Sequence, residues 1–350
     1  LRYVVKVITG NFRIGLQERL LEEAYAQAAG VAAARIRDAC NKTGDLAAVA
    51  DAVARGELDS VGVRLFHPMD FMLAKPLEDA PLADVAPWVV EDKYDGIRAQ
   101  IHASAGEVRI FTRGREDLTA AFPELVELFA GQPSALVADG EILAWQDERP
   151  LPFQALQKRL ARKKVSDELP AEIPVAFIAY DLLYLTGELL LDQPLELRRA
   201  KLVSTGLRVS PQVALADIDR QYAEARGRGH EGLLLKRQGS VYEAGKRSGQ
   251  WLKVKRALAT LDVVITAAEQ GHGRRATLLS DYTFAVRNGE GAFVNIGKAY
   301  AGLTDGELRE LTRSLRSITT GRYGNRVFTV EPQIVLEVAF DGIQTSSRHK

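Results

Sequence analysis

The chain has 350 residues, of which 46% are hydrophobic and 26% charged, and its 46 basic residues balance 46 acidic ones. This composition is typical of an ordinary globular protein, and the single cysteine, Cys40, excludes an internal disulfide. The longest apolar run, 173–185, is interrupted by Pro174 and Asp181, which indicates a buried strand and not a membrane span. The length predicts two or three domains.

Residues 1–60 are predicted to be helical, because Ala-rich segments with apolar residues at helical spacing cover 16–29, 31–40 and 46–54. Large apolar residues are few there, so we do not expect this region to fold alone. It is typical of the tail of a larger helical domain. Since the chain begins at Leu1 and not at Met, we expect a preceding segment to be missing.

From about His67 the pattern changes to short runs rich in Val, Ile, Leu and aromatic residues. Strands are predicted over 88–93, 98–103, 107–112, 136–144, 174–184, 231–236 and 250–254, and helices near 122–130, 153–163, 194–202 and 214–227. Such interspersed elements indicate an α+β domain built on antiparallel sheets. After Arg256, strands at 261–268, 282–287, 292–296 and 333–339 with one helix near 304–315 fit a small OB-type β-barrel.

A lysine ends the first predicted strand, within the stretch Glu91-Asp92-Lys93-Tyr94-Asp95-Gly96-Ile97-Arg98. Lys93 is a weak nucleophile while protonated, with an ordinary pKa of about 10.4, but partial burial and nearby cations favour the free amine. Gly96 would open a tight turn that brings Arg98 back toward the same cavity. On these residues alone, a nucleophilic lysine and an exposed hairpin with an incidental ion pair fit about equally well.

Three further stretches carry polar groups at or inside predicted strands. Asp139-Gly140-Glu141 puts two acids in an apolar strand, which is costly unless the acids face water or a polar cavity. Tyr180-Asp181 lies in another apolar run, where a core aromatic followed by a turn acid is the simpler interpretation. Arg113 lies in the stretch Thr112 to Asp117, which ends a strand with two arginines.

Two lysine-bearing strands follow. In Glu231-Gly232-Leu233-Leu234-Leu235-Lys236, alternation puts Glu231 on the face of Leu233 and Leu235, and Lys236 on the other face. In Trp251-Leu252-Lys253-Val254-Lys255 the two lysines share a face, which indicates a bound polyanion such as a nucleoside triphosphate, or water.

The basic residues are clustered although the net charge is zero. One group is Lys158, Arg159, Arg162, Lys163 and Lys164, and the other is Lys246, Arg247, Lys253, Lys255 and Arg256. For binding a polyanion, the distribution of basic residues matters more than the net charge of the chain. A solvated face and a phosphate-binding surface explain the first group about equally well.

Together these stretches resemble, in order and approximate spacing, the motifs of the covalent nucleotidyltransferases, most closely the ATP-dependent DNA ligases. The matching segments are Lys93 to Arg98, Arg113 with Glu116-Asp117, Asp139 to Glu141, Tyr180-Asp181, Glu231 to Lys236 and Trp251 to Lys255. The Lys-x-Asp-Gly-x-Arg motif is shared with RNA ligases and mRNA capping guanylyltransferases, which therefore remain the alternative. The runs 180–187 and 242–253 are similar to DNA ligases specifically.

The resemblance covers nearly the whole chain and implies three domains. We expect a helical remnant of a DNA-binding domain over 1–62, with matches at 8–10 and 13–16, an adenylation domain over 63–256 and an OB-fold domain over 257–350. The family ends in a basic motif that orients the pyrophosphate. No such motif follows Lys350, so we expect a truncated C-terminus, which leaves the fragment's self-adenylation open.

The resemblance also implies a chemistry, in which Lys93 attacks the α-phosphorus of ATP and becomes lysyl-AMP. AMP then passes to a DNA 5′-phosphate, and the neighbouring 3′-hydroxyl displaces it to seal the nick. The implied nucleotide-binding residues are Glu91 and Tyr180 at the base, Arg98, Arg113 and Arg247 at ribose and phosphate, Lys253 and Lys255 at phosphate, and Glu141 and Glu231 near ribose and a Mg²⁺ or Mn²⁺ ion.

The implied partner is nicked double-stranded DNA, bound mainly through phosphates by a monomer that needs no membrane. Residues 158–164 are candidates for that surface. The resemblance implies a role in DNA replication, repair or recombination, and a place in the bacterial cytoplasm or the eukaryotic nucleus. Protein partners are not predicted.

Overall fold

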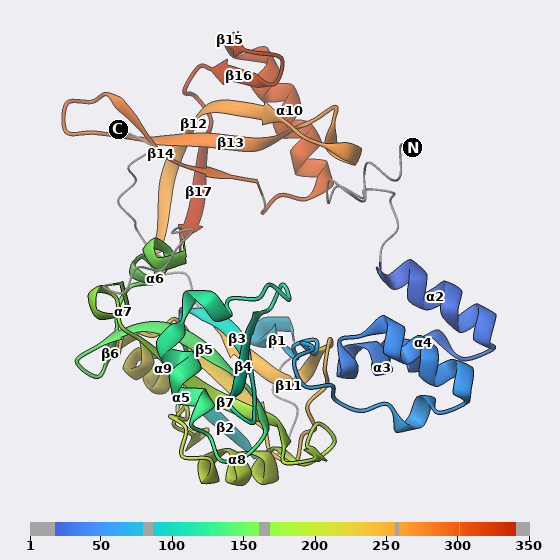
Figure 1. Ribbon diagram of the computed structural model, residues 1–350. Helices are drawn as coiled ribbons and strands as arrows, with labels where there is room; N and C mark the ends of the chain where they lie inside the picture. Colours follow the sequence, from blue (N-terminus) through green and yellow to red (C-terminus); the bar gives the residue numbers. More distant parts are fainter. Residues whose placement is uncertain (1–17, 80–86, 161–168, 256–258, 301, 341–350) are drawn as a thin grey trace. The chain divides into compact units, whose positions relative to one another are not determined.

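The computed structural model describes residues 18–79, 87–160, 169–255, 259–300 and 302–340. It divides into two compact units, 1–255 and 256–350, and each is described by itself (Figure 1). The predicted α+β fold class is confirmed. Among the described strands only β1 and β11 pair in parallel, and every other pair is antiparallel. None of the described helices is long and apolar enough to cross a membrane.

The first unit begins with a helical segment: α2 (Glu18–Ala29), α3 (Ala33–Thr43), α4 (Leu46–Arg55) and the 3₁₀ turn η1 (Leu58–Ser60). Asp45 accepts hydrogen bonds from the amides of Ala47 and Ala48 and so caps α4. Ile36 and Val49 are fully buried between these helices, and the buried Cys40 lies beside them. The helical prediction for this region is confirmed over the described residues.

The nucleophile candidate belongs to a five-stranded sheet of order β1-β11-β10-β2-β9. Its strands are β1 (Leu73–Pro76), β11 (Arg247–Val254), β10 (Gly232–Arg237), β2 (Trp88–Lys93) and β9 (Val213–Ala214), and the 3₁₀ turn η2 (Leu77–Asp79) follows β1. Helix α9 (Ile218–Gly227) packs on one face, over Leu233 and Leu235. The predicted alternation is confirmed for Leu233 to Lys236, because Leu234 and Lys236 point to the other face, whereas Glu231 precedes β10 and pairs with Lys93.

The second sheet has the order β4-β3-β5-β7-β8, with β6 paired to β5. Its strands are β3 (Ile97–Ser104), β4 (Glu107–Thr112), β5 (Leu136–Gln146), β6 (Arg149–Pro150), β7 (Val175–Leu185) and β8 (Glu188–Leu189). The associated helices are η3 (Thr119–Ala121), α5 (Pro123–Ala130), α6 (Phe153–Leu160), α7 (Leu169–Glu172) and α8 (Leu195–Ser204). Phe122, Phe129 and Leu156 cover one face of this sheet and form the largest apolar core.

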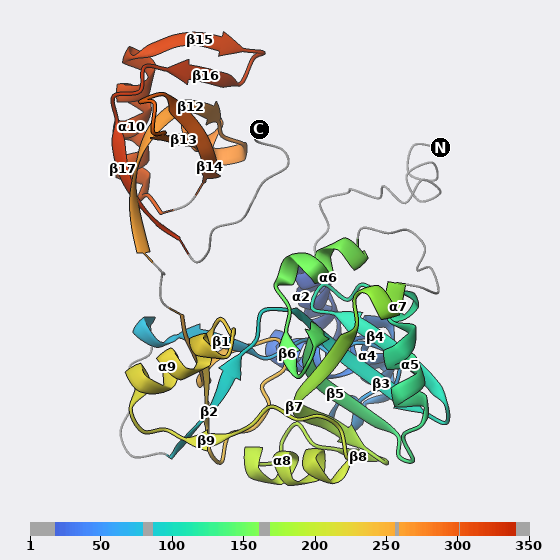
Figure 2. The ribbon, with the colours of Figure 1, turned by 90° about the vertical axis from the view of Figure 1, so that its left-hand side faces the viewer.

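The other faces of the two sheets meet, and β2 and β3 join them through a tight turn. In Figure 2 the strands β1, β2 and β9 lie on one side of the first unit, and β3, β5 and β7 lie on the other. Tyr180 and Leu183 of the second sheet pack with Tyr242 and Trp251 in one buried cluster. Polar side chains at the edge of this cluster form the site described below.

The second unit is built on the long strand β12 (Ala259–Gln270), which pairs with β13 (Leu279–Arg287) along one edge. Along the other edge it pairs with β16 (Val327–Val330) and β17 (Val335–Phe340); β14 (Phe293–Ala299) and β15 (Thr319–Tyr323) complete the sheet. The 3₁₀ turn η4 (Gly273–Arg275) and α10 (Asp305–Ser317), which starts at a Thr304–Glu307 capping box, accompany it. This is the OB-like unit that the sequence predicts.

Candidate active site

A pocket of about 270 Å³ lies between the two sheets of the first unit. We call it the front pocket. It gathers most of the predicted nucleotide-binding residues: Lys93, Arg98, Arg113, Glu141, Tyr180, Arg247 and Lys253. Leu234, Trp251 and Tyr94 supply apolar surface. Glu91, Glu231 and Lys255 do not line it. Glu231 pairs with Lys93, Glu91 faces Leu234 in the register, and Lys255 pairs with Glu231.

Lys93 is the last residue of β2, and its position is fixed by the strand beside it. The amide of Glu231 donates to the carbonyl of Lys93 at 2.7 Å, and Gly232 faces Lys93 in the register. The Lys93 ammonium forms an ion pair with Glu231, which also lies 2.9 Å from Nζ of Lys255. Burial tends to raise the pKa of Glu231, but the charges of the two lysines outweigh it and lower that pKa.

The turn after Lys93 requires glycine at position 96. A Cβ there would lie 2.4 Å from the carbonyl oxygen of Ile142 and 2.9 Å from Cγ of Glu141. The turn therefore rests directly on β5, beside one of the predicted acids. This close approach explains why the motif needs glycine between Asp95 and the arginine.

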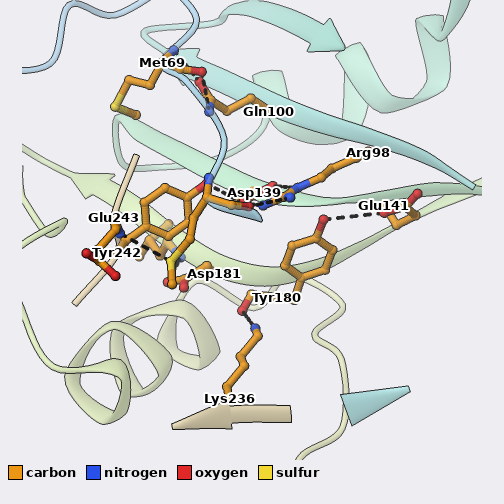
Figure 3. A network of polar contacts seen from close by, with 12 residues as sticks. Met69, Arg98, Gln100, Asp139, Glu141, Tyr180, Asp181, Lys236, Tyr242 and Glu243 are labelled. Carbon is orange, nitrogen blue, oxygen red and sulfur yellow. Dashed lines mark hydrogen bonds and ion pairs between the residues drawn. The ribbon is translucent and has the colours of Figure 1, made fainter. Parts of the chain in front are cut away.

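Arg98 is held in a buried polar network, shown in Figure 3. Its Nε and Nη2 donate to the two carboxylate oxygens of Asp139 at 3.1 and 2.7 Å, and its Nη1 donates to the carbonyl of Met72. Asp139 also accepts from the hydroxyl of Tyr242 at 2.7 Å. Asp139 is thus the partner of the arginine, while Glu141, two residues along β5, faces the pocket.

Glu141 has few partners for a carboxylate. The Tyr180 hydroxyl donates to it over a long 3.4 Å (Figure 3). Burial raises the pKa of Glu141 to about 8, against the opposing charges of Arg98 and Lys93. Tyr180 itself is buried, with the guanidinium of Arg98 5.5 Å from its ring centroid and the ammonium of Lys236 5.0 Å away.

A second acid and lysine lie on the same face of β2 and β10, deeper in the fold. Nζ of Lys236 is 2.8 Å from Oε1 of Glu91 and donates to the carbonyl of Tyr180 at 2.7 Å. Nε2 of Gln212 donates to the same oxygen of Glu91 at 2.6 Å. Gln212 was not predicted as a site residue, because it belongs to no motif and contacts Glu91 only through the fold.

The remaining predicted cations differ in their surroundings. Arg247 donates to the carbonyl of Ala74 at 2.8 Å, and Arg113 is exposed at the rim. Neither Arg113 nor Lys253 has an ion pair in the part of the chain that the structure describes. These two side chains are therefore the ones available to an incoming anion.

The basic group at 158–164 is only partly described, and one member was wrongly assigned to a surface. Arg159 is fully buried, lies 2.5 Å from Glu124 and stacks on the ring of Phe122. It stabilises the junction of α5 and α6 and cannot contact DNA. Lys158 is exposed, and residues 162–164 lie outside the described ranges.

A divalent cation was predicted at Glu141 and Glu231. No group of three or more His, Cys, Asp or Glu side chains suited to a metal occurs among the described residues. Glu141 fits a cation, because it is a carboxylate that lines the pocket with one long hydrogen bond, and a bound cation would offset the burial that raises its pKa. Glu231 fits less directly, since two lysines already neutralise it.

A larger cavity of about 980 Å³, which we call the rear pocket, is lined in part by Glu91 and Tyr94. Asp92, the neighbour of Lys93, lies at its wall and is 2.6 Å from Nη2 of Arg228. Trp145 and Ile178 form part of its apolar surface. None of the positively charged residues predicted to bind the nucleotide lines this cavity.

Two family models and several curated relatives match this chain. A family model described as "ATP dependent DNA ligase domain" matches residues 71–255, and one described as "ATP dependent DNA ligase C terminal region" matches 275–349. A "Probable DNA ligase" of Koribacter versatilis is 44% identical over 99% of this chain and 66% of its own length. A "DNA ligase" of Methanothrix thermoacetophila is 39% identical over 99% of the chain and 65% of its own length.

A solved structure entitled "DNA binding with a minimal scaffold: Structure-function analysis of Lig E DNA ligases" shares the fold. Its TM-score is 0.51 at 20% identity, covering 69% of this chain and 88% of that one. The chain thus spans about two thirds of the length of the curated relatives quoted above. RNA ligases and capping enzymes are not favoured by these matches. The chain belongs to the ATP-dependent DNA ligase family.

Proposed function

We propose that this chain carries out ATP-dependent sealing of nicks in duplex DNA through a lysyl-AMP intermediate. The observation that carries the proposal is the front pocket, where Lys93 lies with Arg113, Lys253 and Tyr180 in one cavity. Few functions other than binding a nucleotide phosphate require a lysine, two available cations and an aromatic ring together.

In the proposed first step, Nζ of Lys93 forms a bond to the α-phosphorus of ATP, and pyrophosphate leaves with the electrons of the broken P–O bond. The lysine must first lose a proton and its ion pair with Glu231. Lys253 and Arg113, which line the pocket, would balance phosphate charge, and Glu141 and Glu231 would hold a Mg²⁺ ion that supplies further neutralisation.

In the later steps, AMP passes from Lys93 to a 5′-phosphate at a nick, and the 3′-hydroxyl displaces it. We propose domains at 1–62, 63–256 and 257–350, with the helical segment and the OB-like unit contributing the DNA-binding surface. Contacts to the phosphates would make binding salt-sensitive and largely independent of sequence. We expect a monomer, located in the compartment that contains the genome.

The proposal is tested by incubating the protein with Mg²⁺ and either ATP or GTP, and measuring its intact mass. A covalent AMP adduct at Lys93 that is lost on adding nicked duplex DNA, with a sealed product, supports it. Labelling by GTP in place of ATP, or sealing of nicks by Lys93→Ala, would contradict it.

A further inference from the structure

The two carboxylate oxygens of Glu91 have unequal surroundings. Oε1 accepts from Gln212 at 2.6 Å and lies 2.8 Å from the Lys236 ammonium. Oε2 is also buried, yet within the described residues it has no hydrogen-bond donor. A buried acceptor without a donor is unfavourable in a folded protein, so it marks a place where a ligand's donor is expected.

This unpartnered oxygen belongs to a side chain that lines the rear pocket and lies on the strand that carries Lys93 to the front pocket. Glu91 and Lys93 are two residues apart on β2 and so point to the same face. Glu91 faces Leu234 in the register, and Leu234 lines the pocket. Lys236, which holds Glu91, also contacts the backbone and ring of Tyr180. Glu91 therefore lies beside the aromatic and aliphatic surface that suits a flat base.

Gln212 is held in place by both sheets. It lies in residues 208–214, which we call the crossing segment. At one end the amide of Ser210 donates to the carbonyl of Ala179, next to Tyr180. At the other end Val213 and Ala214 form β9 against Val89 and Val90, next to Glu91. The backbone on both sides of Gln212 is thus anchored to the strands that carry the aromatic ring and the carboxylate, and its carboxamide donates to Glu91.

We propose that Gln212 is a positioning residue for base selection, which fixes Oε1 of Glu91 so that Oε2 faces the 6-amino group of adenine. The inference rests on the proposed function. Adenine presents an amino donor at C6, where guanine presents a carbonyl acceptor. An ionised carboxylate can only accept hydrogen bonds, so when held in one orientation it favours adenine and repels guanine. Without Gln212 the carboxylate is free to turn both oxygens toward Lys236, and the preference weakens.

The test compares ATP with purine riboside triphosphate, which lacks only the 6-amino group. We expect the wild type to form its nucleotide adduct with ATP faster by on the order of tenfold to a hundredfold, as for a hydrogen bond to a charged group. In Gln212→Met, which keeps the side-chain length and removes the donor, the ratio of the two rates should fall to within about threefold.

Gln221→Met is the matched control. The Gln221 amide donates to the carbonyl of Ala214 and accepts from the amide of Ala216, so it supports the same segment without touching Glu91. A purely structural role for Gln212 would slow both nucleotides equally in both variants. An unchanged ratio in Gln212→Met therefore overturns the proposal, and a lowered ratio in Gln212→Met alone supports it.

Failure of the proposed function gives a different result from failure of base selection. If the wild type forms no covalent adduct, lysyl-AMP chemistry is contradicted, and base selection is then measured by calorimetric binding of AMP and purine riboside monophosphate, which needs no reaction. Equal affinities of the wild type for the two monophosphates overturn the role of Glu91 and Gln212. A preference for AMP that Gln212→Met abolishes supports it.

Discussion

Two acid–lysine pairs link β2 to β10 or to the residue just before it, and they differ in burial and in whether the acid is shared with another lysine. The Glu91–Lys236 pair is closed to solvent, with side chains 1% and 0% exposed. The Lys93–Glu231 pair lies at the end of the strands, 29% and 22% exposed, and Glu231 is shared with Lys255. A buried pair is costly to break because one charge stays unpaired, whereas an open, shared pair exchanges partners easily. The first therefore suits a fixed recognition element, and the second suits a nucleophile that must be released.

The largest effect is expected when the open pair loses its lysine. Lys93→Ala should abolish the AMP adduct and nick sealing altogether, since no other residue can supply the bond to phosphorus. Its free energy of unfolding should change by less than about 1 kcal/mol, because the pair is partly solvated. Intact mass and urea unfolding measure the two quantities. Lys201→Ala, which removes an exposed lysine paired with Glu188, should retain the adduct.

Breaking the closed pair should act mainly on stability. Lys236→Met leaves the Glu91 carboxylate buried without its cation, which should lower the free energy of unfolding by about 3–5 kcal/mol. The double variant Glu91→Gln with Lys236→Met should recover much of that loss, because no charge remains to be paired. Urea denaturation of the single and double variants measures both. A single variant as stable as the wild type would contradict the comparison.

Removing the acid of the open pair should reduce activity and change stability little, the reverse of what is expected for Lys236→Met. Glu231→Gln is expected to slow adduct formation by roughly tenfold to a hundredfold, because Lys93 and Lys255 lose the group that positions them. Its unfolding free energy should fall by no more than about 1 kcal/mol. If Glu231→Gln destabilised the protein as much as Lys236→Met, the two pairs would not differ in kind.

The smallest effect concerns Glu141, which lies near the open pair and has a pKa raised to about 8 from 4.5. Between these values the folded protein keeps a proton that the unfolded chain has released, so this group makes stability fall as pH rises. Glu141→Gln removes that dependence. From about pH 5 to about pH 8 the variant should gain roughly 1 kcal/mol relative to the wild type, since solvent screens a half-buried group. Urea unfolding at both pH values tests it, and parallel pH profiles would contradict it.

Local patterns predicted most elements, and long-range pairing accounts for those they missed. No strand was predicted before residue 88, but Leu73–Pro76 is β1, where an edge position tolerates proline. Helix α9 starts at Ile218 and not at 214, because Val213–Ala214 pairs with β2 and Asp217 provides the cap. The hairpin of β15 and β16 was also missed, since Gly321, Gly324 and Asn325 interrupt any apolar alternation.

In the site, too, contacts between distant segments could not be predicted from local patterns. The motifs contain Lys93, Arg98, Glu141 and Tyr180, and the fold brings these four residues to one pocket. That Lys236 pairs with Glu91, and Lys93 with Glu231, depends on the register of β2 against β10, which no spacing within either strand specifies. Gln212 depends on a contact between residues 121 positions apart, and a polar residue in a loop carries no local signature.

One buried pair has a consequence for the kinetics of nucleotide entry. Asp181 accepts from Nε and Nη2 of Arg198 at 2.7 and 2.9 Å, and Arg198 also donates to the carbonyl of Ser240. These contacts fix the backbone next to Tyr180 to α8 and to the loop before Tyr242. The aromatic wall is therefore rigid before any nucleotide arrives, so binding need not order it and little conformational entropy is lost there. Mobility during capture should be confined to the rim, where Arg113 and Lys253 are unpaired within the described chain.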